Sequence, residues 1–157
     1  MIVPGALADV TATRWPLASA TPPLGALATA PGTVRAFVRD VLAGWQLNGI
    51  TDVCELVASE LVTNAVNAST TPAGRLIYIS GRMPLIRVCL MSDRSQVLIE
   101  VHDEAAGTPE MQAAGTDAED GRGLAMIHML TRGAWGWSPR NGRHGKVVWA
   151  VLPAGVP

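Results

Sequence analysis

Aromatic side chains, charged side chains and lysine are scarce in this chain of 157 residues. Aromatic residues make up 4% of the sequence and charged residues 16%, and the single lysine is Lys146. Twelve basic residues against thirteen acidic ones leave a formal net charge of −1. This balance provides no broad positive surface for a nucleic-acid backbone, so any phosphate site must be local and we expect no nucleic acid among the partners.

Cysteine, histidine and long apolar runs are also limited. The two cysteines, Cys54 and Cys89, have no CxxC spacing and the three histidines are scattered, so the spacing indicates no metal site. We expect both thiols in the core and the histidines in structural or surface positions. No run of about 18 uninterrupted apolar residues occurs, and the N-terminus lacks the basic opening and apolar run of a signal peptide. The sequence therefore predicts a cytoplasmic protein with no membrane span.

The length fits one domain, and the 48% of hydrophobic residues favours a packed core. Residues 1–23, rich in Ala, Thr and Pro, predict a loose or partly extended arm. The folded domain is predicted over residues 24–152, with a short tail at 153–157. Near the N-terminus, Thr13–Ala18 and Leu24–Thr29 are candidates for edge strands, where Pro and small residues are tolerated.

Apolar residues at three- and four-residue spacing predict three helices. These run from Pro31 to a stop at Asn48-Gly49, from a cap at Thr51 or Asp52 to Ala68, and from about Arg122 to Leu130. Segments rich in β-branched residues, separated by turn residues, predict five strands. The strands are Leu76–Ser80, Leu85–Met91, Val97–His102, Ala134–Ser138 and Lys146–Leu152.

The order of these elements predicts the fold class. Helices, three strands forming an antiparallel meander, a helix and two closing strands indicate an α+β protein. We expect a two-layer α/β sandwich, in which a mixed, mostly antiparallel sheet carries helices on one face. Residues 103–121 show no apolar periodicity and predict a loop, and a loop of this length more often has a function than a short connection does.

Glu60 and Asn64 are the first candidate site residues. They lie four positions apart within a strongly helical pattern, which places them on one helix face. A carboxylate can orient or deprotonate an attacking hydroxyl, and a carboxamide oxygen suits a hard cation such as magnesium. The alternative is a solvated helix carboxylate beside an ordinary Asn. The cost of Asn in a helix interior is easier to understand if its amide binds something.

Two further motifs follow in the chain. Asp103 ends an apolar strand where the long loop begins, and its carboxylate can accept a hydrogen bond from an exocyclic amine such as that of adenine. An ordinary Asx turn is the competing interpretation. Gly121-Arg122-Gly123-Leu124 opens a helix, whose free N–H groups favour phosphate. A glycine turn before a helix with no ligand explains the same pattern. Lys146, at a strand end, could reach a phosphate, but we expect it to be solvated.

Together, Glu60-Leu-Val-Thr-Asn64-Ala-Val, Val101-His-Asp103 with Pro109, and Gly121-Arg-Gly-Leu124 resemble the ATP-binding domain shared by gyrase, the chaperone Hsp90, histidine kinases and MutL. Trp135-Gly136, Gly145-Lys146 and Val148-Trp149 follow in the expected order. Within this family the chain is most similar to the anti-sigma-factor serine/threonine kinases, in their small actinobacterial single-domain form. The resemblance covers about residues 24–152.

The resemblance implies a histidine-kinase-like ATPase fold that binds ATP and Mg²⁺. It implies that Asn64 holds the magnesium ion, that Glu60 is the catalytic base or orients the acceptor hydroxyl, and that Asp103 binds the adenine amine. Gly121, Arg122, Gly123 and Leu124 would line the phosphates, under a lid formed by residues 105–120. The chain departs from the family in having Asn67-Ala68-Ser69 where relatives often carry a His, and Ala105 where many have Gly.

The resemblance also implies a regulatory function. The expected protein binds ATP, phosphorylates an anti-sigma-factor antagonist on Ser or Thr, binds a sigma factor, or does both, and can form a homodimer. The alternative from the same resemblance is a non-catalytic interaction module whose shape depends on a nucleotide. The two hypotheses differ in whether Glu60 supports phosphoryl transfer.

Overall fold

The computed structural model describes residues 15–109 and 119–155, with side chains in the second range from residue 123 onward. These residues form one six-stranded sheet in which every strand pair is antiparallel. The strand order is β1-β3-β4-β6-β5, and the short β2 also pairs with β3. The strands are β1 Leu17–Ala20, β2 Leu24–Gly25, β3 Leu85–Ser92, β4 Gln96–Asp103, β5 Trp135–Pro139 and β6 Lys146–Pro153.

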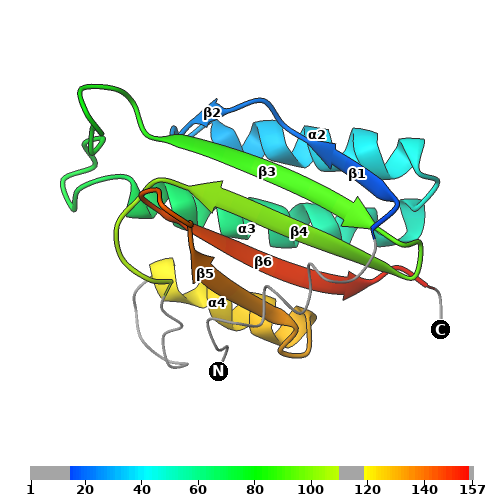
Figure 1. Ribbon diagram of the computed structural model, residues 1–157. Helices are drawn as coiled ribbons and strands as arrows, with labels where there is room; N and C mark the ends of the chain where they lie inside the picture. The colour runs from blue at the N-terminus through cyan, green and yellow to red at the C-terminus, as the bar shows by residue number, and fades with distance from the viewer. Residues whose placement is uncertain (1–14, 110–118, 156–157) are drawn as a thin grey trace.

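In the described part of the chain, three α-helices cover one face of this sheet, and Figure 1 shows them behind the strands. They are α2 Ala30–Gly44, α3 Thr51–Ala68 and α4 Glu119–Leu130, and a 3-10 turn, η1 Asn48–Ile50, joins α2 to α3. The predicted α+β sandwich with helices on one face is confirmed. None of the described helices is long and apolar enough to cross a membrane.

The core lies between the helices and the sheet. Val34, Val38 and Leu42 recur every four residues along α2 and are fully buried, as the predicted amphipathic pattern requires. On β4, Val97, Ile99 and Val101 alternate toward the same core, because successive strand residues point to opposite faces of a sheet. This alternation places Asp103, the last residue of β4, on the helix-covered face.

One predicted strand is wrong. Residues 76–80 form no strand, and their sheet-like pairings are the isolated bridges Thr70↔Leu76 and Ile79↔Arg82. Ser80 and Gly81 adopt φ values of 49° and 76°, which reverse the chain tightly. Both edges of β3 are already occupied, by β1 and β2 on one side and by β4 on the other. The predicted three-strand meander is therefore a β3–β4 hairpin, and the preceding segment extends beyond the sheet (Figure 1).

The ends of the first two helices also differ from the prediction. Helix α2 ends at Gly44, because Gln46 adopts φ 60° and Leu47 N–H bonds the carbonyl of Leu42 at 2.9 Å. This is a Schellman arrangement, which stops a helix by satisfying its last carbonyls. Asn48-Gly49 lies in η1, and α3 continues from that turn with Ile50 at its N-cap and no side-chain cap. The predicted cap at Thr51 or Asp52 is thus wrong, since both residues are already helical.

The remaining boundaries shift by a few residues. The first edge strand is Leu17–Ala20 instead of 13–18, and it pairs with β3 although it lies in the predicted arm. The second shrinks to Leu24–Gly25, because α2 begins at Ala30. Helix α4 begins at Glu119, three residues before the predicted Arg122.

Candidate functional site

Helix α3 presents Glu60 and Asn64 toward the start of the described part of α4. Both side chains are half-buried, and they flank the fully buried Leu61, which anchors the helix in the core. The Nδ2 atom of Asn64 is buried and has no hydrogen-bond partner among the described residues. A buried amide without a partner costs free energy, which a bound ligand can recover.

Gly123 on α4 lies directly against this pair. A Cβ atom added at Gly123 would stand 2.6 Å from Oε2 of Glu60 and 3.6 Å from Oδ1 of Asn64. Real Cβ atoms do not approach an oxygen this closely, so any other residue here would displace the Glu60 carboxylate. The structure therefore brings together three of the predicted site residues, from two helices that are far apart in the sequence.

Asp103 lies at the end of β4 and is held by Lys146, the residue directly opposite it on β6. Lys146 Nζ lies 3.1 Å from Asp103 Oδ1, and the two side chains are only 6% and 1% exposed. The same Oδ1 accepts the N–H of Ala105 at 2.9 Å. The other oxygen, Oδ2, is buried and has no partner among the described residues. It is an acceptor available to a donor such as an exocyclic amine.

Burial raises the pKa of Asp103 above its ordinary value, while the charge of Lys146 opposes that rise. Lys146 thus supports the ionised form, the one in which both carboxylate oxygens accept hydrogen bonds. The expectation of a solvated Lys146 is wrong. Position alone suggested exposure, but the register with Asp103 places its ammonium in the interior.

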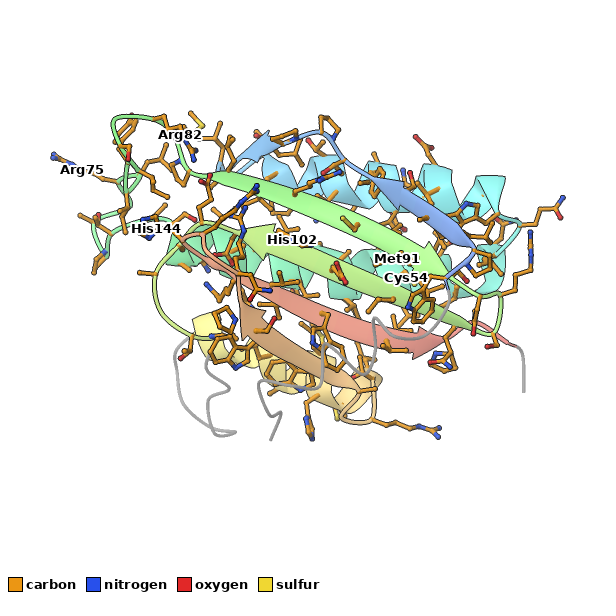
Figure 2. The ribbon with its side chains drawn as sticks, in the orientation of Figure 1. Cys54, Arg75, Arg82, Met91, His102 and His144 are labelled. Atoms are coloured by element: carbon orange, nitrogen blue, oxygen red, sulfur yellow. The ribbon has the colours of Figure 1, made fainter. Side chains whose placement is uncertain are left out.

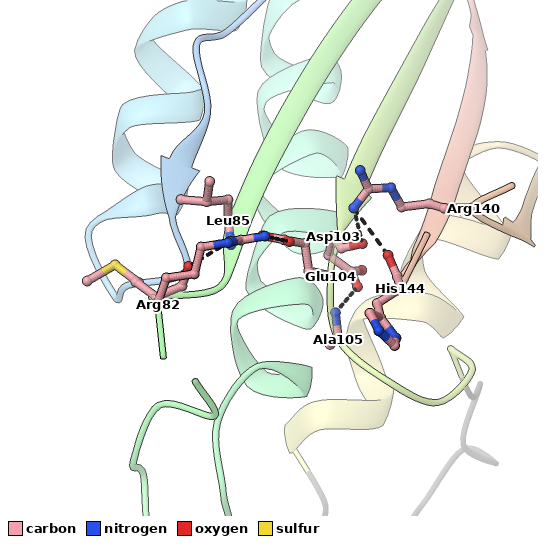
Figure 3. A network of polar contacts seen from close by, with 8 residues as sticks. Arg82, Leu85, Asp103, Glu104, Ala105, Arg140 and His144 are labelled. Atoms are coloured by element: carbon pink, nitrogen blue, oxygen red, sulfur yellow. Dashed lines mark hydrogen bonds and ion pairs between the residues drawn. The ribbon is translucent and has the colours of Figure 1, made fainter. Parts of the chain in front are cut away.

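Gly145 lets the β5–β6 turn approach Asp103. It adopts φ 99°, and an added Cβ would stand 1.8 Å from the Asp103 carbonyl oxygen. Only glycine fits here, for both conformational and steric reasons. The same turn brings Arg140, whose Nη1 donates to the carbonyls of Asp103 at 3.4 Å and His144 at 3.2 Å (Figure 3).

Glu104 braces the other side of the same backbone. Its carboxylate forms a two-bond ion pair with Arg82, with one N–O distance of 2.8 Å, and accepts the N–H of Leu85 at 2.8 Å. Figure 3 shows these contacts converging on the segment that carries Asp103. The backbone that carries Asp103 is therefore held by contacts on both sides.

A cavity of about 260 Å³ connects these groups. Asn64 on α3 and Asp103 with Lys146 on the sheet line the same cavity, together with Leu124 of α4. Its remaining lining residues are Leu61, Ala65, Asn67, Ala68, Ala106, Thr108, Pro109 and Val148. Apolar walls with a few convergent polar groups are typical of a small-molecule site. A larger cavity of about 580 Å³ lies elsewhere, on the face of the sheet that none of the described helices covers.

Two predicted site residues are only partly described. Gly121 and Arg122 lie within the first turns of α4, but their side chains are outside the described residues. Residues 110–118 of the predicted lid are likewise outside them. The roles of Gly121, Arg122, Gly123 and Leu124 at the phosphates stay predictions.

The family described as the histidine kinase-like ATPase domain matches residues 25–152. The chain belongs to this family. No curated protein matches the chain significantly. The ATPase domain therefore accounts for most of the sequence and includes Glu60, Asn64, Asp103 and Lys146.

Membership of this family implies that the chain binds ATP, and the residues lining this cavity have chemistry that fits that ligand. Asp103 offers an unpaired acceptor at one position of the cavity, and Asn64 offers an unpaired amide at another. Lys146 was the residue that sequence reasoning missed. The pair Gly145-Lys146 is one of the motifs that resemble the family, so the sequence did point to this position. The contact of Lys146 with Asp103, however, follows only from the β4–β6 register.

Proposed function

We propose that this ATPase domain is an anti-sigma-factor-type serine/threonine kinase, which transfers the γ-phosphoryl group of ATP to a hydroxyl of an antagonist protein. The observation that carries the proposal is the convergence of Glu60, Asn64 and Gly123. A carboxylate and a carboxamide meet there at a glycine whose missing side chain leaves room for them. A carboxylate at this point supports phosphoryl transfer, because it can orient an acceptor hydroxyl or take its proton.

Each group has a chemical role in this proposal. The oxygen of Asn64 is a hard donor suited to Mg²⁺, which would neutralise the phosphate charge. Glu60 would orient the acceptor hydroxyl and take its proton as the new phosphate ester forms and ADP leaves. Asp103 would recognise the adenine amine through its unpaired Oδ2. The partners in this proposal are an anti-sigma-factor antagonist as phosphoacceptor, a sigma factor, or both, and the protein can act as a homodimer.

The proposal is tested with purified protein, Mg²⁺, ATP labelled at the γ-phosphate and the anti-sigma-factor antagonists of the source organism. Transfer is followed to each antagonist and to a version in which its acceptor Ser or Thr is replaced by Ala. Glu60→Gln should abolish transfer while ATP still raises the melting temperature. Linkage makes that shift measurable, because a ligand at 100 times its dissociation constant adds about 2.7 kcal/mol to the free energy of unfolding.

Glu55→Gln is the matched control, since Glu55 lies on the same helix but outside the pocket, in a 2.6 Å ion pair with Arg39. It should leave transfer unchanged. Asn64→Ala should remove the magnesium-dependent part of the ATP-induced shift. ATP binding without transfer to any antagonist would contradict the kinase and favour the non-catalytic, nucleotide-dependent interaction module. Transfer that survives Glu60→Gln would remove Glu60 from its proposed role.

A further inference from the structure

The face of the sheet that none of the described helices covers, which we call the open face, carries a cluster of three side chains outside the cavity assigned to ATP. In the antiparallel register Cys89 of β3 lies opposite Glu100 of β4, and His102 lies two residues further along β4. Directly opposite and alternate residues share a face of a sheet, so all three point away from the helices. Figure 2 shows His102 on this open face.

The potential ligand atoms of these residues are close together. Cys89 Sγ, a Glu100 carboxylate oxygen and a His102 ring nitrogen all lie within 4.8 Å of one another. His102 Nε2 and Glu100 Oε2 are 3.0 Å apart. In a tetrahedral site with bonds of about 2.0–2.3 Å, ligand atoms stand about 3.3–3.8 Å apart. Small rotamer changes therefore suffice to place all three atoms around one ion.

We propose that Cys89, Glu100 and His102 form a binding site for a divalent transition-metal ion, with Zn²⁺ as the preferred occupant. A thiolate, an imidazole and a carboxylate are the ligands that zinc prefers. Mg²⁺ and Ca²⁺ take oxygen ligands, so this site discriminates against the ion expected beside the phosphates. Binding places a thiolate and a neutral imidazole on the ion, and the displaced protons go to solvent.

Among the described residues, the cross-strand neighbours of the cluster leave one coordination position open. Across the strands, Ala20 lies opposite Cys89, Trp149 opposite Glu100, and Arg87 and Val147 opposite His102. None of these offers a fourth ligand to zinc. His102 also lines the cavity of about 580 Å³, which opens this side of the site. Three protein ligands with an open position leave room for water or an anion, and the guanidinium of Arg87 favours an anion.

The same side chains also interact without a metal. Hydrogen bonds to Cys89 and Glu100 raise the pKa of His102 to about 9, so a protonated ring can bridge the two acceptors. An ion and a proton compete for the same atoms in this arrangement. A cluster held only by hydrogen bonds is expected to bind no transition-metal ion in a titration, whereas a metal site is expected to bind one equivalent.

The test uses the full chain, stripped of metal with a chelator and titrated with Co²⁺, a spectroscopic substitute for Zn²⁺. We expect one equivalent to produce a thiolate-to-cobalt charge-transfer absorption, which Zn²⁺ removes and excess Mg²⁺ does not. Cys89→Ser should abolish the absorption although Cys54 is still present. Circular dichroism and thermal unfolding show whether the variant remains folded.

Affinity for Zn²⁺ is then measured by competition with a chromophoric chelator. Glu100→Gln and His102→Asn should each weaken it by about tenfold or more, since even the outer-shell partners of metal ligands contribute 10–100-fold. Met91→Leu is the matched control, a sulfur-bearing neighbour on β3 and on the same face as Cys89 (Figure 2). It should leave affinity unchanged.

Three results would overturn the site: no charge-transfer absorption, an absorption that persists in Cys89→Ser, or an equal loss of affinity in Met91→Leu. The outcome is independent of the proposed kinase function. Asn64→Ala, which alters the predicted magnesium ligand on the other side of the sheet, should leave the cobalt spectrum intact.

Discussion

Asp103 and Lys146 on the helix-covered face of the sheet contrast with Glu100 and His102 on its open face. The first pair is 1% and 6% exposed, and the second is 9% and 31% exposed. His102 and Asp103 are neighbours on β4, so one strand supplies a charged group to each face. A buried pair needs both partners because either charge alone is costly, whereas His102 is partly exposed and depends less on its partner.

The contrast extends to what each face leaves unsatisfied. On the helix-covered face, Asp103 Oδ2 and Asn64 Nδ2 are buried without partners among the described residues, and both side chains line one cavity. On the open face, Glu100 and His102 hydrogen-bond each other, and the unpaired buried atom there, among the described residues, is Nε1 of Trp149, a ring N–H donor opposite Glu100. The arrangement on the helix-covered face is suited to a nucleotide. On the open face, His102 and Glu100 share a proton, which the proposed metal ion would displace.

The largest expected effect comes from breaking the buried pair. Lys146→Met removes the cation and leaves the Asp103 carboxylate buried, which should lower the free energy of unfolding by about 3–5 kcal/mol. Glu100→Gln on the open face should cost about 1 kcal/mol, because Gln keeps an acceptor oxygen and the His102 side chain, 31% exposed, can also bond water. Urea unfolding measures both. Equal losses in the free energy of unfolding would show that the greater burial of Asp103 and Lys146 does not make their pair more important for stability.

A double-mutant cycle sharpens this result. Asp103→Asn with Lys146→Met removes both charges, so its cost should be smaller than the sum of the two single costs. The ATP-induced melting shift should nevertheless be lost whenever Asp103 is replaced, because a carboxamide cannot offer the same unpaired anionic acceptor to adenine. Strictly additive costs would mean that the two side chains do not stabilise each other.

Gly145→Ala should have the next largest effect, on the helix-covered face alone. The new Cβ would meet the Asp103 carbonyl at 1.8 Å in a backbone with φ 99°, so we expect a loss of about 3 kcal/mol and of ATP binding. Gly142→Ala is the matched control, with φ 64° and no atom within 4 Å of its Cβ. It should cost about 1–2 kcal/mol, the left-handed penalty alone, and should spare ATP binding. Similar losses of ATP binding in both variants would contradict the steric explanation.

The sequence predicted the helix-covered face better than the open one. The periodicity of Val34, Val38 and Leu42 predicted α2, and the four-residue spacing of Glu60 and Asn64 predicted their shared helix face. Both are local patterns. Lys146 was misjudged because its burial depends on β4 and β6 pairing across a long sequence separation.

The same limit explains the open face. Cys89 lies 11 residues before Glu100 and 13 before His102, which matches no metal-ligand spacing, and only the hairpin register brings them together. Residues 76–80 show the converse error. Their Ile and Tyr content favours a strand, but a strand needs a free sheet edge, and sequence composition does not reveal which edges are occupied.

Gly123→Ala should separate chemistry from stability at the proposed ATP site. Alanine favours a helix by about 1 kcal/mol over glycine, so stability should change little or rise slightly. The new Cβ would displace the Glu60 carboxylate, and a misplacement of about 1 Å can reduce transfer roughly a hundredfold. Gly44→Ala in α2, with no atom within 4 Å, is the matched control and should not alter transfer. Unchanged transfer in Gly123→Ala would argue against Glu60 as the base.

The smallest expected effect is a difference in reactivity between the two thiols, Cys54 and Cys89. Burial raises the pKa of Cys54 to about 12, so its thiol stays protonated in the folded protein at pH 8, whereas an unfolded cysteine titrates near its ordinary value. The pKa of Cys54 is higher in the folded protein than in the unfolded chain. Its thiol therefore lowers the free energy of unfolding as the pH rises from about 9 to about 12. Cys54 is fully buried, whereas Cys89 is half-buried on the open face.

Iodoacetamide at pH 8, with metal removed, should therefore modify Cys89 in the native protein and reach Cys54 only after unfolding in urea. Mass spectrometry of the two cysteine-containing peptides measures the order of reaction. Cys89→Ser should leave the native protein unmodified, which assigns the reaction to that position. Modification of Cys54 at the rate of Cys89 would mean that α3 opens readily from the sheet. The helix-covered face would then lack the rigidity on which the positions of Glu60 and Asn64 depend.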